Sequence, residues 1–177
     1  MKTSKLVYMS LLVSMALVLS LVEKTMPLPF TTPGAKLGLA NLVTVISIYT
    51  LDNYKDCFIV VILRIILSAM MGGNMSSLLY SISGAILSFL ASIVIKTLGS
   101  NHISVIGVSA SSAIFHNLGQ LFVASLILEN SMIFLYLPML SFIGVFTGVF
   151  VGVCANYLLL HINKLPYFKN QLLTYKD

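Results

Sequence analysis

The chain has 177 residues, of which 58% are hydrophobic and 8% are charged. Soluble domains are about 45–50% apolar and about 25% charged, so this composition excludes a conventional water-exposed surface. Most of the exterior must therefore face lipid, and we expect an integral membrane protein without a separate soluble domain. The net charge of +5 comes from scattered basic residues rather than a basic patch, which argues against nucleic-acid binding.

Six apolar segments follow one another along the chain and predict an all-α bundle of six transmembrane helices. The first segment is not followed by a small-residue cleavage site, so we expect it to be retained. The second is short for a membrane helix, which indicates local bilayer thinning or burial among neighbours. The predicted helices are 6–22, 37–51, 57–71, 75–95, 105–128 and 132–160, in a single membrane-embedded domain covering residues 1–177.

Two of these segments have patterns that favour helix packing or an internal site. Gly144, Gly148 and Gly152 form two overlapping GxxxG units in the last segment, and such units let helices approach closely. The fifth segment has one polar face, because its polar and small residues recur at helical spacing. The members of this face are Ser109, Ser112, Ala113, His116 and Gln120.

The distribution of lysines predicts the orientation in the membrane. With both termini in the cytoplasm, two lysines, Lys24 and Lys36, lie outside and the other seven lie inside, as the positive-inside rule requires. We therefore expect a multi-pass protein of the cell membrane. In this topology residues 23–36 and Glu129–Ser131 face outward, and the Lys96–Ser104 loop is cytoplasmic.

The residues that support metal or redox chemistry are few. Cys57 and Cys154 lie in or beside apolar segments without a Cys or His partner motif, so we interpret them as small core residues. Asp52 and Asp56 are four residues apart, and a solvated turn with Lys55 is a simpler interpretation than a magnesium site. The sequence has no DDxxD element, phosphate loop or HExxH motif, so we expect neither an enzyme nor a bound cofactor or metal.

Arg64 and His116 are the strongest candidates for a binding site. Arg64 is close to the middle of its predicted helix, where a charge that faces lipid costs several kcal/mol. It is either a structural residue that binds helix-end carbonyls or the anchor for an anionic group. His116, with Asn117 beside it and Gln120 one turn away, is either an interhelical contact or part of a binding pocket that also contains Arg64.

Four residues near the predicted outer surface are further candidates. Asn41 lies just inside the second segment, and Glu23, Lys24 and Lys36 flank the Pro-rich loop before it. These residues either rim the same cavity or, in the case of the three ionic ones, anchor helix ends at the membrane interface.

Several strings resemble one known family. They are residues 21–30 (LVEKTMPLPF), residues 33–41 (PGAKLGLAN), the LRIIL run around Arg64, and residues 116–120 (HNLGQ). In this order they resemble the Gx transporter family, which is also described as heptaprenyl diphosphate synthase component I. The family is similar to the substrate-binding S components of energy-coupling factor (ECF) transporters.

The resemblance implies a particular function. It implies a six-helix subunit that binds a small molecule in an outward-facing pocket and docks through its first helix on a transmembrane coupling subunit, with separate ATPase subunits supplying energy. S components dock through an AxxxA-like element, and the corresponding residues here are Ser10 and Ser14. From the residues themselves we expect the substrate-binding set to be Arg64, His116, Asn117, Gln120, Asn41, Lys36 and Glu23. Arg64, His116 and Lys36 suit an anionic or strongly hydrogen-bonding headgroup, whereas apolar pocket walls would equally suit an isoprenoid or vitamin-like body.

Two other functions remain open. One is a noncatalytic membrane component associated with a polyprenyl (heptaprenyl) diphosphate synthase. The other is a structural subunit of a redox membrane complex. Copurification with coupling subunits, with a soluble prenyl synthase or with a redox assembly separates the three.

Overall fold

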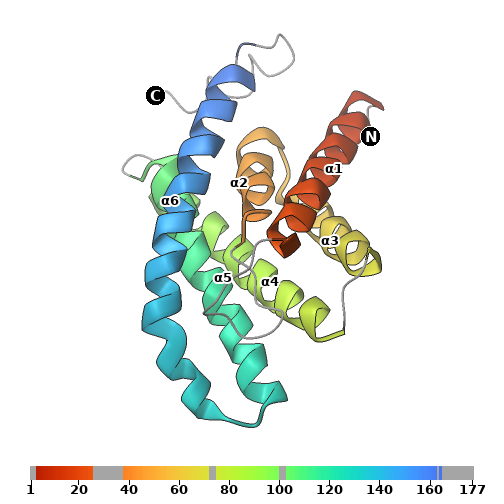
Figure 1. The fold of residues 1–177 in the computed structure, drawn as a ribbon. Coiled ribbons are helices and arrows are strands. Elements are labelled where there is room, and N and C mark those ends of the chain that lie inside the picture. Colours follow the sequence, from red (N-terminus) through yellow and green to blue (C-terminus); the bar gives the residue numbers. More distant parts are fainter. Residues whose placement is uncertain (1–2, 26–37, 72–74, 100–102, 163, 165–177) are drawn as a thin grey trace.

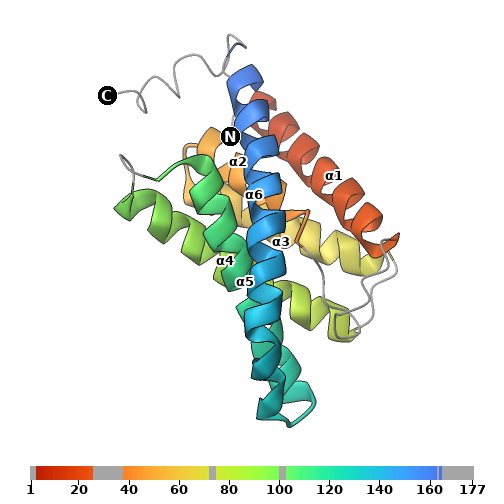
Figure 2. The ribbon, with the colours of Figure 1, turned by 60° about the vertical axis from the view of Figure 1, so that its left-hand side comes forward.

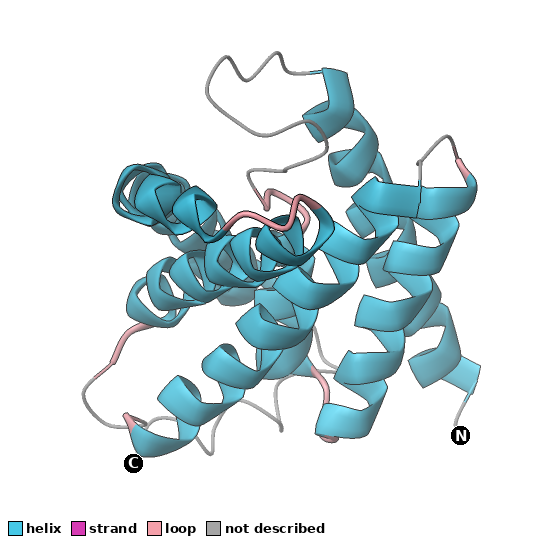
Figure 3. Cartoon of the chain, turned by 90° about the horizontal axis from the view of Figure 1, so that it is seen from below, coloured by secondary structure: helices cyan, strands magenta, loops and turns pink. Residues whose placement is uncertain are grey.

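The computed structural model describes residues 3–25, 38–71, 75–99, 103–162 and 164, and Lys36 lies outside them. In the described ranges all regular secondary structure is helical (Figure 3). The elements are α1 (Thr3–Thr25), α2 (Asn41–Thr50), α3 (Tyr54–Met70), α4 (Met75–Leu98), α5 (Val105–Ile127), the 3-10 helix η1 (Ser131–Tyr136) and α6 (Leu137–Ile162). The predicted all-α class is therefore confirmed.

Four segments of the described chain are long and apolar enough to cross a membrane, and these identify a membrane protein. They are Thr3–Glu23, Met75–Leu98, Val105–Ile127 and Ser131–Ile162. The apolar helix α2 has 10 residues and rises only about 15 Å, half of a hydrocarbon core of about 30 Å. The 17-residue α3 contains three charged residues. The predicted count of six spanning helices thus remains a prediction.

The second predicted helix begins four residues later than expected, at Asn41 instead of residue 37. Gly38 has a φ of 85°, a left-handed conformation that an α-helix cannot contain. The backbone N–H of Asn41 then donates to the carbonyl of Gly38 at 2.8 Å, which forms a tight turn directly before α2. A hydrophobicity pattern does not detect this turn, because Leu37 and Leu39 continue the apolar run.

The last predicted helix, 132–160, is wrong in one respect, because it is not continuous. Residues Ser131–Tyr136 form η1, and the α-helix begins at Leu137. Pro138 explains the break, since its ring would clash with the carbonyl of Phe134 in a continuous α-helix but is tolerated in a first helical turn.

The short helix α2 lies at the centre of the molecule (Figure 1). It contacts all five other α-helices, and eight of its ten residues are buried. Its apolar side chains join those of α1, α3 and α6 in one core cluster, which includes Leu12, Val43, Val60 and Leu159. Burial among neighbours thus accounts for an apolar helix that is too short to span a membrane.

Helices α4 and α6 both pack closely against α5 (Figures 1 and 2). A Cβ atom at Gly148 would lie 2.7 Å from the Cα of Ala110, and one at Gly152 would lie 2.7 Å from the Cα of Ile106. These distances confirm close packing along the GxxxG edge. The opposite face of α6 exposes Phe142, Phe146 and Phe150, as expected for a lipid-facing surface.

The beginning of α1 and the end of α6 lie at the same end of the molecule in both ribbon views (Figures 1 and 2). Met9 of α1 and Leu159 of α6 belong to the same core cluster, which agrees with this arrangement. The α5–η1–α6 turn lies at the opposite end.

Candidate functional site

A small cavity lies between α1, α3, α4, α5 and the turn before α2. Its volume is about 20 Å³, enough for a water molecule. Nine residues from these elements line it: Ser20, Glu23, Gly38, Ala40, Arg64, Ile65, Ser68, Ser81 and His116. Three of them, Glu23, Arg64 and His116, are site residues that the sequence predicted.

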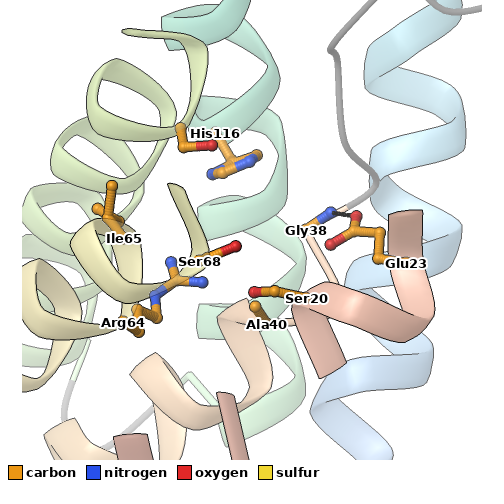
Figure 4. Close-up of a pocket in the computed structure, with 9 residues that line it drawn as sticks. Ser20, Glu23, Gly38, Ala40, Arg64, Ile65, Ser68 and His116 are labelled. Carbon is orange, nitrogen blue, oxygen red and sulfur yellow. Dashed lines mark hydrogen bonds between the residues drawn. The ribbon is translucent and has the colours of Figure 1, made fainter. Parts of the chain in front are cut away.

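Arg64 supplies the positive charge of the cavity. Its side chain is 6% exposed, and its guanidinium group points into the cavity beside Ser68 (Figure 4). Arg64 Nε is buried and forms no hydrogen bond in the described part of the chain. A buried polar atom without a hydrogen bond is costly, so this nitrogen is available to bind an acceptor. Whether Arg64 anchors an anionic group or has a structural role stays a prediction.

Glu23 supplies the negative charge. It is 4% exposed, and its Oε1 accepts a hydrogen bond from the backbone N–H of Gly38 (Figure 4). This bond connects the end of α1 to the turn before α2. Glu23 thus lies inside the molecule, which is not the position of a side chain that anchors a helix end at the interface.

His116 forms the wall of the cavity on α5. Its ring lies between two glycines: a Cβ atom at Gly38 would be 3.4 Å from His116 Cδ2, and one at Gly84 would be 2.9 Å from Cε1. Gln120 Nε2 lies 3.0 Å from His116 Nε2. Because an amide nitrogen can only donate, Nε2 of a neutral His116 accepts, and its proton is on Nδ1. Gln120 thus positions His116 and does not line the cavity itself.

Asn41 and Asn117 connect helices beside the cavity. Asn41 Nδ2 donates to Ser112 Oγ at 2.6 Å, and Asn41 Oδ1 accepts from Ser88 Oγ at 3.2 Å, so this side chain joins α2, α4 and α5. Asn117 Nδ2 donates to the carbonyl of Leu140 on α6 at 2.7 Å. Neither residue lines the cavity that contains Arg64.

Sequence reasoning missed the hydroxyl groups of the cavity. Ser20 lies three residues before Glu23, and Ser68 lies four residues after Arg64, so each shares a helix face with a charged residue. This helical spacing is the sequence signal that could have identified both serines as cavity residues. Ser81 Oγ donates to the carbonyl of Ser77 at 2.7 Å, which leaves its oxygen able to accept.

The opposite end of the helices has a second set of polar contacts that the sequence did not predict. Asp56 is buried and forms an ion pair with Lys5, so it is not part of a solvated turn with Lys55. Lys96 belongs to α4 rather than to a loop, and its Nζ donates to the carbonyl of Ile48 at 2.7 Å. No group of three or more His, Cys, Asp or Glu side chains in the described residues is arranged to hold a metal ion.

The outer face of α1 contains Ser10 and Ser14. Both are exposed, and each hydroxyl donates to a carbonyl one turn earlier in the same helix, at 3.0 and 2.9 Å. Large exposed apolar side chains surround them, including Val7, Leu11 and Val18. The described residues of the same chain thus leave this pair of small side chains uncovered.

Comparison with known proteins gives a family match. The family described as heptaprenyl diphosphate synthase component I matches residues 12–158. This range includes the cavity and the four complete α-helices α2 to α5, and it covers α1 and α6 in part. No curated protein and no solved structure matches the chain.

Proposed function

The chain belongs to the heptaprenyl diphosphate synthase component I family, and we propose that it is a membrane subunit that captures a small molecule in the cavity around Arg64. The observation that carries this proposal is the buried guanidinium, whose Nε has no hydrogen-bond partner in the described chain. His116 and the serines of the cavity add further polar groups around it. A mostly apolar membrane protein with a few convergent polar groups in a cavity fits a ligand-binding role.

Binding requires the cavity to open. Its present volume of about 20 Å³ holds a water molecule, whereas drug-sized ligands occupy pockets of about 300–1,000 Å³. We propose that the ligand places a polar or anionic group beside Arg64 while the helices around it separate. Mass spectrometry of the gently purified protein tests this directly, and a retained small molecule is the expected result. Protein that carries only lipid and water would contradict capture.

We further propose that the subunit lies in the cell membrane and docks on a coupling subunit through the outer face of α1. Lipid provides no hydrophobic driving force between helices, so close contact through small side chains must supply much of the association. Ser10 and Ser14 offer such a contact among bulky neighbours. A partner ATPase would then energise uptake.

Replacement of both Ser10 and Ser14 by leucine tests the docking role. We expect loss of copurification with a coupling subunit and loss of uptake, because the added side chains fill the contact, while the isolated protein keeps its ligand. A matched control is the Val149→Leu and Val153→Leu double variant, which adds bulk to the exposed face of α6. Normal assembly of the serine variant would exclude this docking surface.

The orientation in the membrane is a separate prediction. In a background where both cysteines are replaced by serine, we expect Asn53→Cys and Ser131→Cys to react from opposite sides. Both residues are exposed, at the start of α3 and of η1. Labelling with a membrane-impermeant thiol reagent in intact cells should reach only position 131. Labelling of both positions from one side would contradict the six-span topology.

The family description favours one second candidate. It names a component of a heptaprenyl diphosphate synthase, which supports a noncatalytic membrane partner for such an enzyme. In that case affinity purification should recover a soluble prenyl synthase instead of coupling and ATPase subunits.

A further inference from the structure

A second, narrower space lies beside the cavity around Arg64 (the Arg64 cavity), between the turn before α2, the start of α2, and helices α5 and α6. Gly38 lines both spaces, so one glycine turn separates them. The walls on α5 are also successive, because Ala113 lines the second space and His116, three residues later, lines the first. In the present conformation the second space leaves no room for a water molecule.

Ser109 of α5 lines the second space and has an unsatisfied hydroxyl group. Its side chain is fully buried, and its Oγ forms no hydrogen bond within the ranges that the structure describes. A serine inside a helix commonly donates to the carbonyl one turn earlier, as Ser111 does to Gly107 at 2.9 Å. Burial of a hydroxyl without a partner costs free energy, and water does not fit beside Ser109. A ligand that reaches Ser109 therefore makes a hydrogen bond that the protein itself does not make.

Two further side chains of the second space have hydrogen-bonding capacity left. The Asn41 amide carries two N–H groups, and one of them donates to Ser112 Oγ at 2.6 Å. Thr147 Oγ1 donates to the carbonyl of Gly144 at 3.1 Å, so its oxygen can still accept. The rest of the lining is small or apolar: Gly38, Ala113, Gly148 and Val151. The second space thus combines apolar walls with a few polar groups, as ligand sites do.

We propose that the captured ligand extends past Gly38 into the second space, and that Ser109 is a specificity-determining residue that binds a polar group at the far end of the ligand. The ligand class is then an elongated, mostly apolar small molecule. It places an anionic or accepting group at Arg64 and a hydroxyl, carbonyl or amine group at Ser109. This inference rests on the proposed capture function and narrows its substrate class. It also gives the direction in which the Arg64 cavity enlarges from its volume of about 20 Å³.

Linear carboxylic acids test the inference, because one series carries a terminal hydroxyl group and a matched series of equal lengths does not. Binding of both series to the full chain in detergent is measured by isothermal titration calorimetry at neutral pH. At the chain length that spans the two spaces, we expect the hydroxyl acid to bind about five- to tenfold more tightly, which corresponds to about 1–1.4 kcal/mol. Ser109→Ala should abolish this preference. Its unfolding temperature should be unchanged or higher, since the Ser109 hydroxyl has no hydrogen bond to lose within the described residues.

Thr44→Val is the matched control. Thr44 of α2 is also buried, and its Oγ1 likewise lacks a hydrogen bond among the described helices and turns, but it lines neither space. This variant should keep the preference for the hydroxyl acid. Arg64→Met should weaken binding of both series, because the carboxylate loses its partner.

The outcomes separate this inference from the capture function. Equal binding of the two series to the native protein, or a preference that survives in Ser109→Ala, would overturn the inference and leave capture at Arg64 intact. If neither series binds, the inference is also wrong, and mass spectrometry of the purified protein then decides on capture by itself. A retained small molecule would keep the capture function, whereas protein without one would remove both.

Discussion

Arg64→Met is expected to lower ligand affinity by about 10- to 100-fold, because a charge-assisted hydrogen bond to a buried site contributes about 1.5–3 kcal/mol. Methionine retains much of the apolar stem and removes only the charge and its donors. The Nε of Arg64 has no hydrogen bond to lose in the described structure. Removal of a buried charge relieves the cost of its desolvation, whereas loss of attraction to Glu23 is unfavourable. We therefore expect the free energy of unfolding to change by no more than about 1 kcal/mol.

The measurement compares ligand retained per mole of folded protein with thermal stability in detergent. Arg64→Lys is the control: it keeps the charge but loses the planar fork of donors, so an intermediate affinity is expected. A variant that unfolds several degrees earlier, yet binds normally when folded, would assign Arg64 a structural role. The separation of affinity from stability decides between the two roles that the sequence left open.

The sequence predicted the helical elements well because lipid imposes a simple rule on them. Each run of apolar residues long enough to span the membrane must form a helix, since only internal hydrogen bonds satisfy its backbone. Two of the errors are at Gly38 and Pro138, where local backbone chemistry, not hydrophobicity, decides the boundary. Pro138 was visible in the sequence, whereas the positive φ of Gly38, which lies against Glu23 and His116, could be seen only in the structure.

The candidate site was predicted only in part. Arg64 and His116 were found because polar residues are conspicuous in apolar helices, and they do line one cavity. The roles of Asn41 and Asn117 were not accessible, because the direction of an amide side chain depends on which neighbouring helix offers an acceptor or donor. The central position of α2 is a property of tertiary packing. The hydrophobic pattern of a ten-residue helix cannot show that five other helices contact it.

Tertiary packing also explains why the sequence analysis assigned Lys96 to a loop. A lysine after an apolar run normally marks the membrane surface. Here its ammonium group reaches the carbonyl of Ile48 at the end of α2 and lies 4.5 Å from the centre of the Tyr49 ring. A positive charge at a helix C-terminus is favourable, so Lys96 stabilises the position of α2.

Gly119→Ala is expected to be the most disruptive single-methyl substitution between α4 and α5. A Cβ atom at this position would lie 2.6 Å from the carbonyl oxygen of Ser83 and 2.9 Å from the Cα of Gly84. Both are backbone atoms, which cannot rotate away, so the two helices must separate. Overpacking in a close-packed interior costs about 1–3 kcal/mol and occasionally more, and we expect the upper part of this range.

Gly107→Ala provides the matched control on the same helix. There the added Cβ would meet the Cγ2 of Ile103 at 2.8 Å, and this is a side-chain atom that can move. We expect Gly107→Ala to change stability by less than about 1 kcal/mol. Thermal unfolding in detergent, followed by the reaction of a thiol-specific dye with the buried Cys57, measures both variants.

We also expect Gly119→Ala to change the geometry of the binding site. His116 lies one turn before Gly119 on α5, and its backbone oxygen would be only 2.9 Å from a Cβ atom at Gly84. Separation of α4 from α5 therefore moves the wall of the cavity that carries His116. We expect ligand retention to fall in the fraction of Gly119→Ala that still folds, whereas Gly107→Ala retains its ligand. Equal stability and equal retention in the two variants would show that close approach of α4 and α5 does not hold the site together.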